Sequence, residues 1–457
     1  MTGIIVLIIY ALIMVGATLL FTKHGKNGED FNVGSRNMGT IISAMSVAAT
    51  WIWAPALFTS AEKAYSNGFA GLFWFLVPNV LCLLVFIPFA KKIRREMPHG
   101  ITLSGYMYQK YESKTVRNTY LFQLTMLTVL STAVQLLAGG KILSLVTGLP
   151  MWIMTIILAV IAFSYASISG IRASVLTDGI QMVFLLIACA VFVPWALKLN
   201  GGLSAIQLTG STGEYTSLFT GKGLEVFLGF GLPTAIGLFA GPFGDQCFWQ
   251  RAFSIRQDKI GKSFSLGAVL FAIVPLSMGI LGFIAAGIGF TPADAGQVNF
   301  ELIKAIFPSW VIVPFMFMLI SGLLSTVDSN LCAISSLTTD VSKMENTTIG
   351  KGAMVILLIV GILIANIPGL TVTHMFLFYC TFRATTMLPT IMTLLKVKLT
   401  GKGVTAGIIT ALVVGLPIFA YGTISGISIY KTVGSLTTVL SAGIVAFIVS
   451  KIPKREA

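Results

Sequence analysis

The stretch GLLSTVDSNLCAISSLTTD, residues Gly322–Asp340, combines an apolar composition with a dense group of side-chain oxygens. Four of them, Ser325, Thr326, Asp328 and Ser329, fall within five residues. Positions 325, 328 and 329 are spaced i, i+3, i+4 and so share one face of a helix. Hydroxyl and carboxylate oxygens are the hard ligands that a small cation prefers, and a carboxylate at membrane depth normally faces a partner or a watery cavity. The stretch predicts a membrane helix with an ion site, unless its hydroxyls only join helices or bond to their own backbone.

The whole chain has the composition of a membrane protein. Its 457 residues are 56% hydrophobic and 10% charged, whereas soluble domains carry about 25% charged residues. The net charge of +14 does not indicate nucleic-acid binding, because the basic residues lie in short connections between apolar runs. We therefore predict an all-α polytopic protein that lies in the lipid bilayer, with no nucleic-acid partner and no obligatory protein partner. The five cysteines show no ligand spacing and are expected to be small buried apolar residues.

Apolar runs of about 20 residues predict about 13 transmembrane helices, all within a single transport domain over residues 1–457. The expected spans are 3–22, 39–61, 69–90, 119–147, 150–169, 174–198, 225–249, 264–290, 309–340, 350–367, 371–395, 404–422 and 433–451. An odd number of spans places the two termini on opposite sides. Lysines and arginines are far more frequent in the connections on the side of the C-terminus, Arg251 being counted among them. This bias predicts a cell-membrane protein with its N-terminus outside and its C-terminus in the cytoplasm.

Two of the expected spans contain helix-breaking residues at matching positions. The span 39–61 holds Pro55, which lacks an N–H, and the span 225–249 holds Pro233, Gly237 and the pair Gly241-Pro242. The two spans lie five apart, and interrupted helices at corresponding positions of two halves indicate an inverted-repeat transporter. We therefore expect one repeat over 39–198 and a second over 225–395, with an extra helix at 3–22 and two more within 404–451. The alternative is that each interruption is a tolerated kink.

Several motifs resemble one family. The opening run Phe31-Asn32-Val33-Gly34-Ser35-Arg36, followed by Ser46-Val47-Ala48-Ala49-Thr50-Trp51, resembles the F-x-x-G-G-R opening of the sodium:solute symporter family. The segment Gly170–Gln181, GIRASVLTDGIQ, is similar to its G-G-x-x-A-x-x-x-T-D-x-x-Q segment, and Asp245–Arg251, DQCFWQR, to its Q-x-x-x-Q-R run. The resemblance covers most of the chain in the same order. It implies a leucine-transporter-type core formed by the second to eleventh spans.

The resemblance also implies a sodium site between the broken second span and the ninth. It would be formed by backbone carbonyls of Ala49, Ile52 and Gly322 and by the hydroxyls of Ser325 and Thr326. Carbonyls can turn toward an ion only where a helix is broken, and Pro55 supplies a cause for a break. The family usually shows two adjacent serines where this chain has Ser325-Thr326.

A second cation position is the next candidate. Asp178 lies near the start of the sixth span, and with Asp328 and Ser329 it would provide two carboxylates and a hydroxyl. Family members with such a site have a hydroxyl where this chain has Asp328. The alternatives are that Asp178 is solvated at the membrane edge, and that Asp328 binds sodium, accepts a proton or pairs with Arg383.

Arg383 lies in the middle of an apolar span, where a guanidinium needs an anion or several carbonyls. It either pairs internally with Asp178 or Asp328, or binds a solute that carries a carboxylate or urea-like oxygens. The resemblance places Thr381 near a substrate contact. The other candidate solute contacts are Trp53, Ala56, Thr59, Gln135, Leu238 and Gly241.

These features predict a secondary active symporter, coupled to Na+, that imports a small polar solute such as a carboxylate, an amino acid or a urea-like compound. A proton-coupled or uncoupled transporter of the same fold is the alternative. An intramembrane enzyme with an Asp178/Asp328 dyad is a second alternative, but no cleavage motif supports it, and we assign no catalytic residue. The sequence does not choose the solute.

Overall fold

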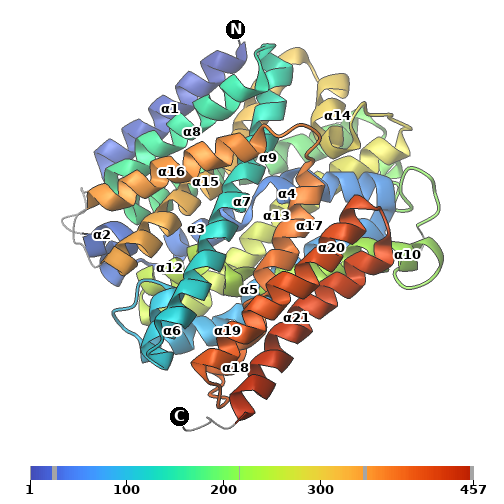
Figure 1. The fold of residues 1–457 in the computed structure, drawn as a ribbon. Coiled ribbons are helices and arrows are strands. Elements are labelled where there is room, and N and C mark those ends of the chain that lie inside the picture. The colour runs from blue at the N-terminus through green and yellow to red at the C-terminus, as the bar shows by residue number, and fades with distance from the viewer. Residues whose placement is uncertain (1, 23–27, 216, 343–346, 453–457) are drawn as a thin grey trace.

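The computed structural model describes residues 2–22, 28–215, 217–342 and 347–452, and these residues form a helical bundle (Figure 1). No β-strand occurs within these ranges; one isolated parallel bridge joins Met38 to Ile255. The all-α prediction is therefore confirmed for the part of the chain that the structure describes.

Eleven helical segments of the described chain are long and apolar enough to cross a membrane. Nine are single helices: α1 (Thr2–Phe21), α5 (Thr59–Glu96), α7 (Lys114–Thr147), α8 (Met151–Ser169), α9 (Ile171–Leu199), α13 (Ile260–Gly287), α15 (Ile312–Ser342), α16 (Thr347–Ala365) and α21 (Ser428–Lys451). Two contain a π-helical turn between two α-helices: α10 (Gly221–Val226) with α11 (Leu232–Gly244), and α19 (Gly401–Thr410) with α20 (Leu416–Ile424). The expected number of 13 is not confirmed.

The two remaining expected spans, 39–61 and 371–395, are both divided into short helices. The first comprises α3 (Thr40–Trp51) and α4 (Ala54–Leu57) and continues into α5, in which Gly68 adopts a positive φ of 58°. The second comprises α17 (Val372–Ala384) and α18 (Met387–Leu394). Neither half of such a divided span is long enough to cross a bilayer by itself, so the two spans are not among the eleven segments.

Short helices cover the two ends of the bundle. Figure 1 shows α2 (Gly28–Val33), α6 (Leu103–Tyr111) and α12 (Gln246–Ser254) near one end, and α14 (Val298–Ile306) at the other, where α1 begins. These helices lie in connections between the long helices.

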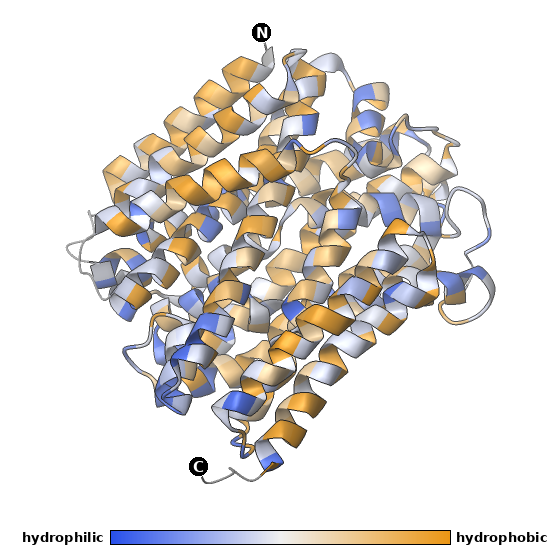
Figure 2. Ribbon diagram, viewed as in Figure 1, coloured by the Kyte–Doolittle hydropathy of each residue, from blue (hydrophilic) through white to orange (hydrophobic). Residues whose placement is uncertain are grey.

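The outer surface of the bundle is apolar, as Figure 2 shows for α1, α16 and α20. Large apolar side chains are exposed there, for example Leu12 at 69% and Ile424 at 87%. Polar side chains lie mainly in the interior of the bundle instead, above all on α15. This reversal of the pattern found in soluble proteins is expected for a surface in contact with lipid.

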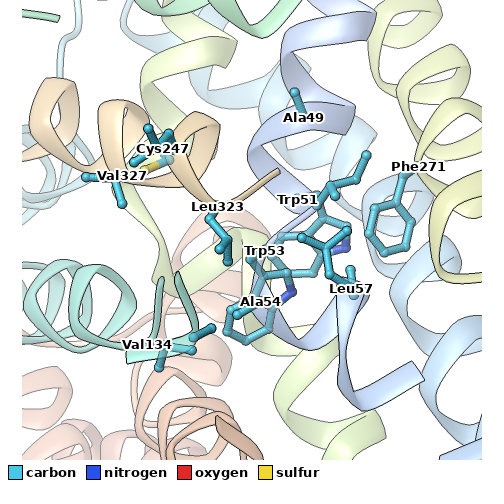
Figure 3. Close-up of a cluster of buried hydrophobic side chains, with 14 of the residues drawn as sticks. Ala49, Trp51, Trp53, Ala54, Leu57, Val134, Cys247, Phe271, Leu323 and Val327 are labelled. Atoms are coloured by element: carbon cyan, nitrogen blue, oxygen red, sulfur yellow. The ribbon is translucent and has the colours of Figure 1, made fainter. Parts of the chain in front are cut away.

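The predicted break in the second span is confirmed, at Ile52 and Trp53. Both residues leave the helical region, with φ/ψ of −83°/83° and −106°/177°. Pro55 follows in the first turn of α4, where its missing N–H removes no helical hydrogen bond. Figure 3 shows Trp51 and Trp53 at this break, with Leu323 of α15 and Val134 of α7 beside it.

The predicted interruption of the seventh span at Pro233–Pro242 is wrong in its position. The chain is helical through Pro233 and Pro242, and it breaks only at Asp245, whose φ/ψ is −114°/118°. A π-helical turn directly precedes Pro233, and such turns accommodate a proline that cannot bond to the previous turn.

The glycines of α11 serve packing rather than bending. A Cβ on Gly237 would lie 2.2 Å from Cys380 Cβ, and a Cβ on Gly244 would lie 2.8 Å from the Arg383 carbonyl oxygen. The side of α11 that faces α17 is therefore flat, and the two backbones approach closely.

Candidate functional site

The five residues predicted for the first sodium site lie together at the break between α3 and α4. The Ser325 hydroxyl donates to the carbonyls of Ala49 at 2.9 Å and Gly322 at 3.0 Å. The Thr326 hydroxyl lies 3.4 Å from the Thr50 carbonyl and 3.5 Å from the Ile52 carbonyl. Carbonyl and hydroxyl oxygens thus meet from two helices that are far apart in sequence.

This arrangement has the chemistry of a small-cation site. Its donor atoms are neutral, hard oxygens, and the Thr326 contacts of 3.4–3.5 Å are too long for strong hydrogen bonds. The residues are all buried, Thr326 being the most exposed at 4%. No group of three or more His, Cys, Asp or Glu side chains fit for a metal occurs in the described ranges.

The residues predicted for a second cation position also lie together, on α9 and α15. Asp328 accepts hydrogen bonds from Ser174 at 2.6 Å and Tyr165 at 2.8 Å, with the Thr177 and Ser329 hydroxyls at 3.4 Å. Asp178 accepts from Ser46 at 2.6 Å. Both carboxylates are fully buried, so the alternative of an Asp178 solvated at the membrane edge is wrong.

Arg251 on α12 completes this cluster, and sequence reasoning missed it. Its guanidinium donates from Nη2 to Asp178 at 2.9 Å and to Ser329 at 2.7 Å, and from Nε to Ser46 at 3.0 Å. Arg251 was expected in a cytoplasmic connection, but it is buried, at 1% exposure. The Q-x-x-x-Q-R resemblance was the one signal that could have marked it.

Arg383 does not pair with Asp178 or Asp328, so of its two expected alternatives the internal ion pair is wrong. Its guanidinium carbon lies 4.1 Å from the Tyr379 ring centre, 5.1 Å from that of Trp51 and 5.3 Å from that of Trp53. We call these four residues the aromatic cage. Arg383 is fully buried, and its Nε and Nη1 have no hydrogen-bond partner in the described chain.

Trp53 and Gly241 are the other predicted solute contacts that lie at the cage. The indole Nε1 of Trp53 has no partner, although the residue is only 3% exposed. A Cβ on Gly241 would lie 2.4 Å from both Arg383 Nη1 and the Trp51 ring, so only glycine leaves room for the guanidinium here.

The remaining predicted contacts have other surroundings. The Gln135 side chain accepts from the Ala54 N–H at 2.7 Å and so caps the start of α4. Thr381 bonds to the Leu377 carbonyl at 3.2 Å and lies 3.3 Å from Ser435 of α21, away from the cage. Ala56 and Leu238 are buried, and the hydroxyl of Thr59 lies 3.3 Å from that of Thr373.

Asp245, at the break between α11 and α12, is a further residue that sequence reasoning did not select. Its carboxylate accepts from the Tyr379 hydroxyl at 2.9 Å and from the Cys247 N–H at 2.9 Å, and it is 7% exposed. Tyr379 thereby connects a buried carboxylate to the aromatic cage. The signal was the acidic residue directly after the Gly/Pro-rich run of α11.

A cavity of about 380 Å³ opens at the end of the bundle where α1 begins. Charged and hydroxyl side chains line it, among them Thr59, Glu62, Lys63, Lys141, Thr373 and Lys431. The Thr373 hydroxyl donates to Glu62 at 2.7 Å, which joins α17 to α5 at the wall of the cavity. Thr59 therefore belongs to this outer cavity.

The opposite end is held closed by contacts between short helices and connections. Arg36 donates to the carbonyls of His99 at 2.9 Å and Gly100 at 2.6 Å, and it pairs with Glu29 at 2.9 Å. Thr102 donates to Asp340 at 2.7 Å. The polar cavity thus opens at one end of the bundle, while these hydrogen bonds tie the short helices together at the opposite end.

The sequence matches the profile of the Sodium:solute symporter family over residues 31–415, and the chain belongs to this family. It is 25% identical over 288 residues to the probable urea active transporter 1 of Schizosaccharomyces pombe, and this alignment covers 60% of this chain and 43% of that protein. It is 22% identical over 439 residues to the urea-proton symporter DUR3 of Oryza sativa, covering 86% of this chain and 60% of the relative. The sodium/pantothenate symporter of Escherichia coli is 26% identical over 291 residues, covering 60% and 59%. The chain spans roughly 40–60% of the length of these curated relatives.

Solved structures show the same fold. A Na+-coupled sialic acid symporter in a substrate-bound outward-open state matches with a TM-score of 0.77 at 17% identity, covering 98% of both chains. MhsT in complex with L-phenylalanine matches with a TM-score of 0.59 at 15% identity, covering 90% of this chain and 98% of that one. The chain is therefore a multi-pass membrane protein with the leucine-transporter-type fold. Its named relatives are transporters and symporters, not enzymes.

Proposed function

We propose that this protein is a sodium-coupled symporter that imports a small polar solute by alternating access. The observation that carries the proposal is the meeting of the Ala49, Ile52 and Gly322 carbonyls with the Ser325 and Thr326 hydroxyls at the α3–α4 break. A Na+ ion held there would bridge the broken helix to α15, so that its binding stabilises one arrangement of these two elements over another.

The structure supports alternating access through its asymmetry. A polar cavity opens at one end of the bundle, while the opposite end is closed by Arg36 and by the Thr102–Asp340 contact. The two broken stretches, at Ile52–Trp53 and at Asp245, lie in the spans that open the two repeats expected over 39–198 and 225–395. We retain these repeats, and the additional flanking helices, as part of the proposal.

The orientation is likewise proposed from charge. Placing the N-terminus outside makes the polar cavity face the exterior of the cell membrane. Removing Arg251 from the cytoplasmic set leaves the excess of basic residues on the C-terminal side intact. In intact cells, a cysteine at exposed Glu214 should react with an impermeant maleimide and one at exposed Asp258 should not; the reverse pattern would overturn the orientation.

The names of the relatives suggest urea and pantothenate as solutes and, from the rice relative, a proton as an alternative coupling ion. Uptake that follows a pH gradient in the absence of Na+ would favour the proton. The alternatives are separated by measuring uptake into proteoliposomes under a Na+ gradient, a pH gradient, or neither.

The decisive variant is the double substitution Ser325→Ala/Thr326→Ala. It removes two hydroxyl ligands and leaves the apolar face of α15 intact, so the Na+ concentration needed for half-maximal thermal stabilisation should rise at least tenfold. Each lost ligand is expected to weaken binding by about 1.5–3 kcal/mol. The control is Thr338→Ala on the same helix, whose hydroxyl donates to the Ile334 carbonyl of the preceding turn at 2.8 Å. An unchanged Na+ requirement in the first variant would refute the site.

A further inference from the structure

A second cleft, of about 640 Å³, lies at the end of the bundle opposite the polar cavity, where α5 ends and the connection from α12 leads into α13. Lys91, Arg95, Gln257 and Asp258 line it. Lys91 and Arg95 are four residues apart on α5 and so share one face of that helix. The Lys91 ammonium also lies against α13, because a Cβ on Gly261 would be 2.8 Å from its nitrogen. Basic side chains of α5 therefore lie directly over the start of α13.

The charges around this cleft are mostly positive. Asp258 is the acidic residue that lines it, and its carboxylate pairs with Arg256 at 3.2 Å and with Lys259 at 3.2 Å. Lys91 and Arg95 form no ion pair or hydrogen bond with any residue that the structure describes. Four cations thus share one carboxylate, which leaves three positive charges without a partner in the described chain.

The neighbouring acidic residue does not compensate these charges. Glu96, at the end of α5, accepts from the Tyr106 hydroxyl of α6 at 2.6 Å, so its carboxylate is already engaged by another helix. The first turn of α13 contains Lys262 and no acidic residue, although the N-terminus of a helix favours negative charge. The group that this cleft lacks is therefore an anion.

The cleft also lies at the boundary of the lipid bilayer. α5 and α13 pack against each other, and each exposes apolar side chains along the part that precedes or follows the cleft. These are Leu81, Leu84 and Val85 on α5, and Leu266, Val269 and Ile273 on α13. Basic side chains directly beyond the apolar part of a membrane helix reach the level of the lipid headgroups. A lipid whose acyl chains lie along these two helices therefore brings its phosphate to the cleft.

We propose that this cleft binds an anionic phospholipid, such as phosphatidylglycerol, whose phosphate is held by Lys91 and Arg95 of α5 and by Arg256 and Lys259 of the connection. Clusters of basic residues next to a membrane helix attract anionic headgroups, whereas a zwitterionic lipid brings its own cation. A soluble anion meets the same charges but gains nothing from the apolar side chains. With the orientation proposed above, the lipid belongs to the cytoplasmic leaflet. The inference is independent of the solute and of the coupling ion.

The connection that would hold the lipid is joined to the start of α3. The Arg256 N–H donates to the Met38 carbonyl at 3.2 Å, and the Met38 N–H donates to the Ser254 carbonyl at 3.2 Å. A lipid held between α5 and this connection therefore links three parts of the chain at the same end of the bundle. Since it binds only the folded arrangement of these parts, it should stabilise the protein against unfolding.

The first experiment uses the purified full-length protein in a neutral detergent and follows its thermal unfolding as lipid is added. Phosphatidylglycerol should raise the melting temperature in a saturable manner, and phosphatidylcholine with identical acyl chains should not. Inorganic phosphate and glycerol 3-phosphate distinguish a lipid from a soluble anion, and neither should raise it. A rise with either soluble anion equal to that with phosphatidylglycerol would overturn the inference. So would an equal rise with phosphatidylcholine, or no rise with phosphatidylglycerol.

The second experiment changes the charge of the cleft in both directions. Lys91→Gln/Arg95→Gln should raise the phosphatidylglycerol concentration for half-maximal stabilisation on the order of 30-fold, and Asp258→Asn should lower it about fivefold. The matched control is Lys398→Gln/Lys402→Gln, which removes the same charge at the same end of the bundle, between α18 and α19 (Figure 1). All five side chains are exposed, so the substitutions leave the packing of the helices unchanged. Equal losses in the two double variants, or an unchanged affinity in Asp258→Asn, would refute binding at this cleft.

Discussion

Arg251 and Arg383 are both buried guanidiniums, yet their surroundings are opposite. Arg251 is bonded to Asp178, Ser329 and Ser46 and to the Cys247 carbonyl, so its charge and its donors have partners within the chain. Arg383 lies among aromatic rings, with two of its nitrogens unbonded. Burial alone therefore does not assign a role to a charged side chain. The partners do: Arg251 holds α12 to α3, α9 and α15, whereas Arg383 keeps two nitrogens without a partner in the described chain.

The largest effect that tests this comparison is expected for Arg251→Ala. The substitution leaves the Asp178 carboxylate buried without its cation, which should lower the free energy of unfolding by about 3–5 kcal/mol. Arg383→Ala strands no carboxylate and loses mainly its ring contacts, on the order of 2 kcal/mol or less. Chemical denaturation in detergent, without solute, measures both values.

The control for this prediction is the double variant Arg251→Ala/Asp178→Asn, which removes the stranded charge and should recover most of the lost stability. Equal costs for the two arginine variants, or no recovery in the double variant, would contradict the distinction between a paired and an open guanidinium.

An intermediate effect is expected for Gly241→Ala, which tests whether the room beside Arg383 matters. The added Cβ would lie 2.4 Å from Arg383 Nη1 and from the Trp51 ring, so the guanidinium must move. Overpacking of this kind costs about 1–3 kcal/mol, and solute-dependent stabilisation should fall with it. Gly352→Ala on α16 is the control, because no atom lies within 4 Å of its added Cβ. Full retention of solute stabilisation in Gly241→Ala would separate the glycine from the binding site.

The smallest effect is expected for Thr381→Val. The Thr381 hydroxyl bonds to its own helix and lies near Ser435, so its loss should cost about 0.5–1.5 kcal/mol. Solute affinity should stay within a factor of two of that of the unaltered protein. A large loss of affinity measured by the same thermal-shift titration would place Thr381 at the solute after all.

The sequence was informative where one residue determines the local backbone. Pro55 predicted the break at Ile52–Trp53, and the i, i+3, i+4 spacing placed Ser325, Asp328 and Ser329 on one interior face. It was less informative where a residue's role depends on its neighbours in space. Gly237, Gly241 and Pro242 indicated a kink, but the chain stays helical there, the two glycines make room for Cys380 and Arg383 of α17, and the true break follows at Asp245.

The two arginines show the same limit. In the sequence, Arg251 lies close to the charged residues of a connection. Only the packing of α12 against α9 and α15 shows that its side chain is buried. For Arg383 the sequence left two options open, and it could not choose because the competing partner Asp178 was already taken by a residue from another helix. Helix geometry argues against Thr381 as a solute contact beside Arg383, since residues two apart on a helix point to nearly opposite sides.

The five cysteines have a practical consequence. All of them are buried, at 3% exposure or less, as predicted from their apolar surroundings. In the conformation described here, the unaltered protein should therefore react only slowly with thiol reagents. Cys380 packs against Gly237 of α11, and Cys247 lies on α12 beside Asn330 of α15. These two thiols lie where the helices of the aromatic cage and of the closed end meet. The rate at which each thiol is alkylated after Na+ or solute is added therefore measures how often those helices separate.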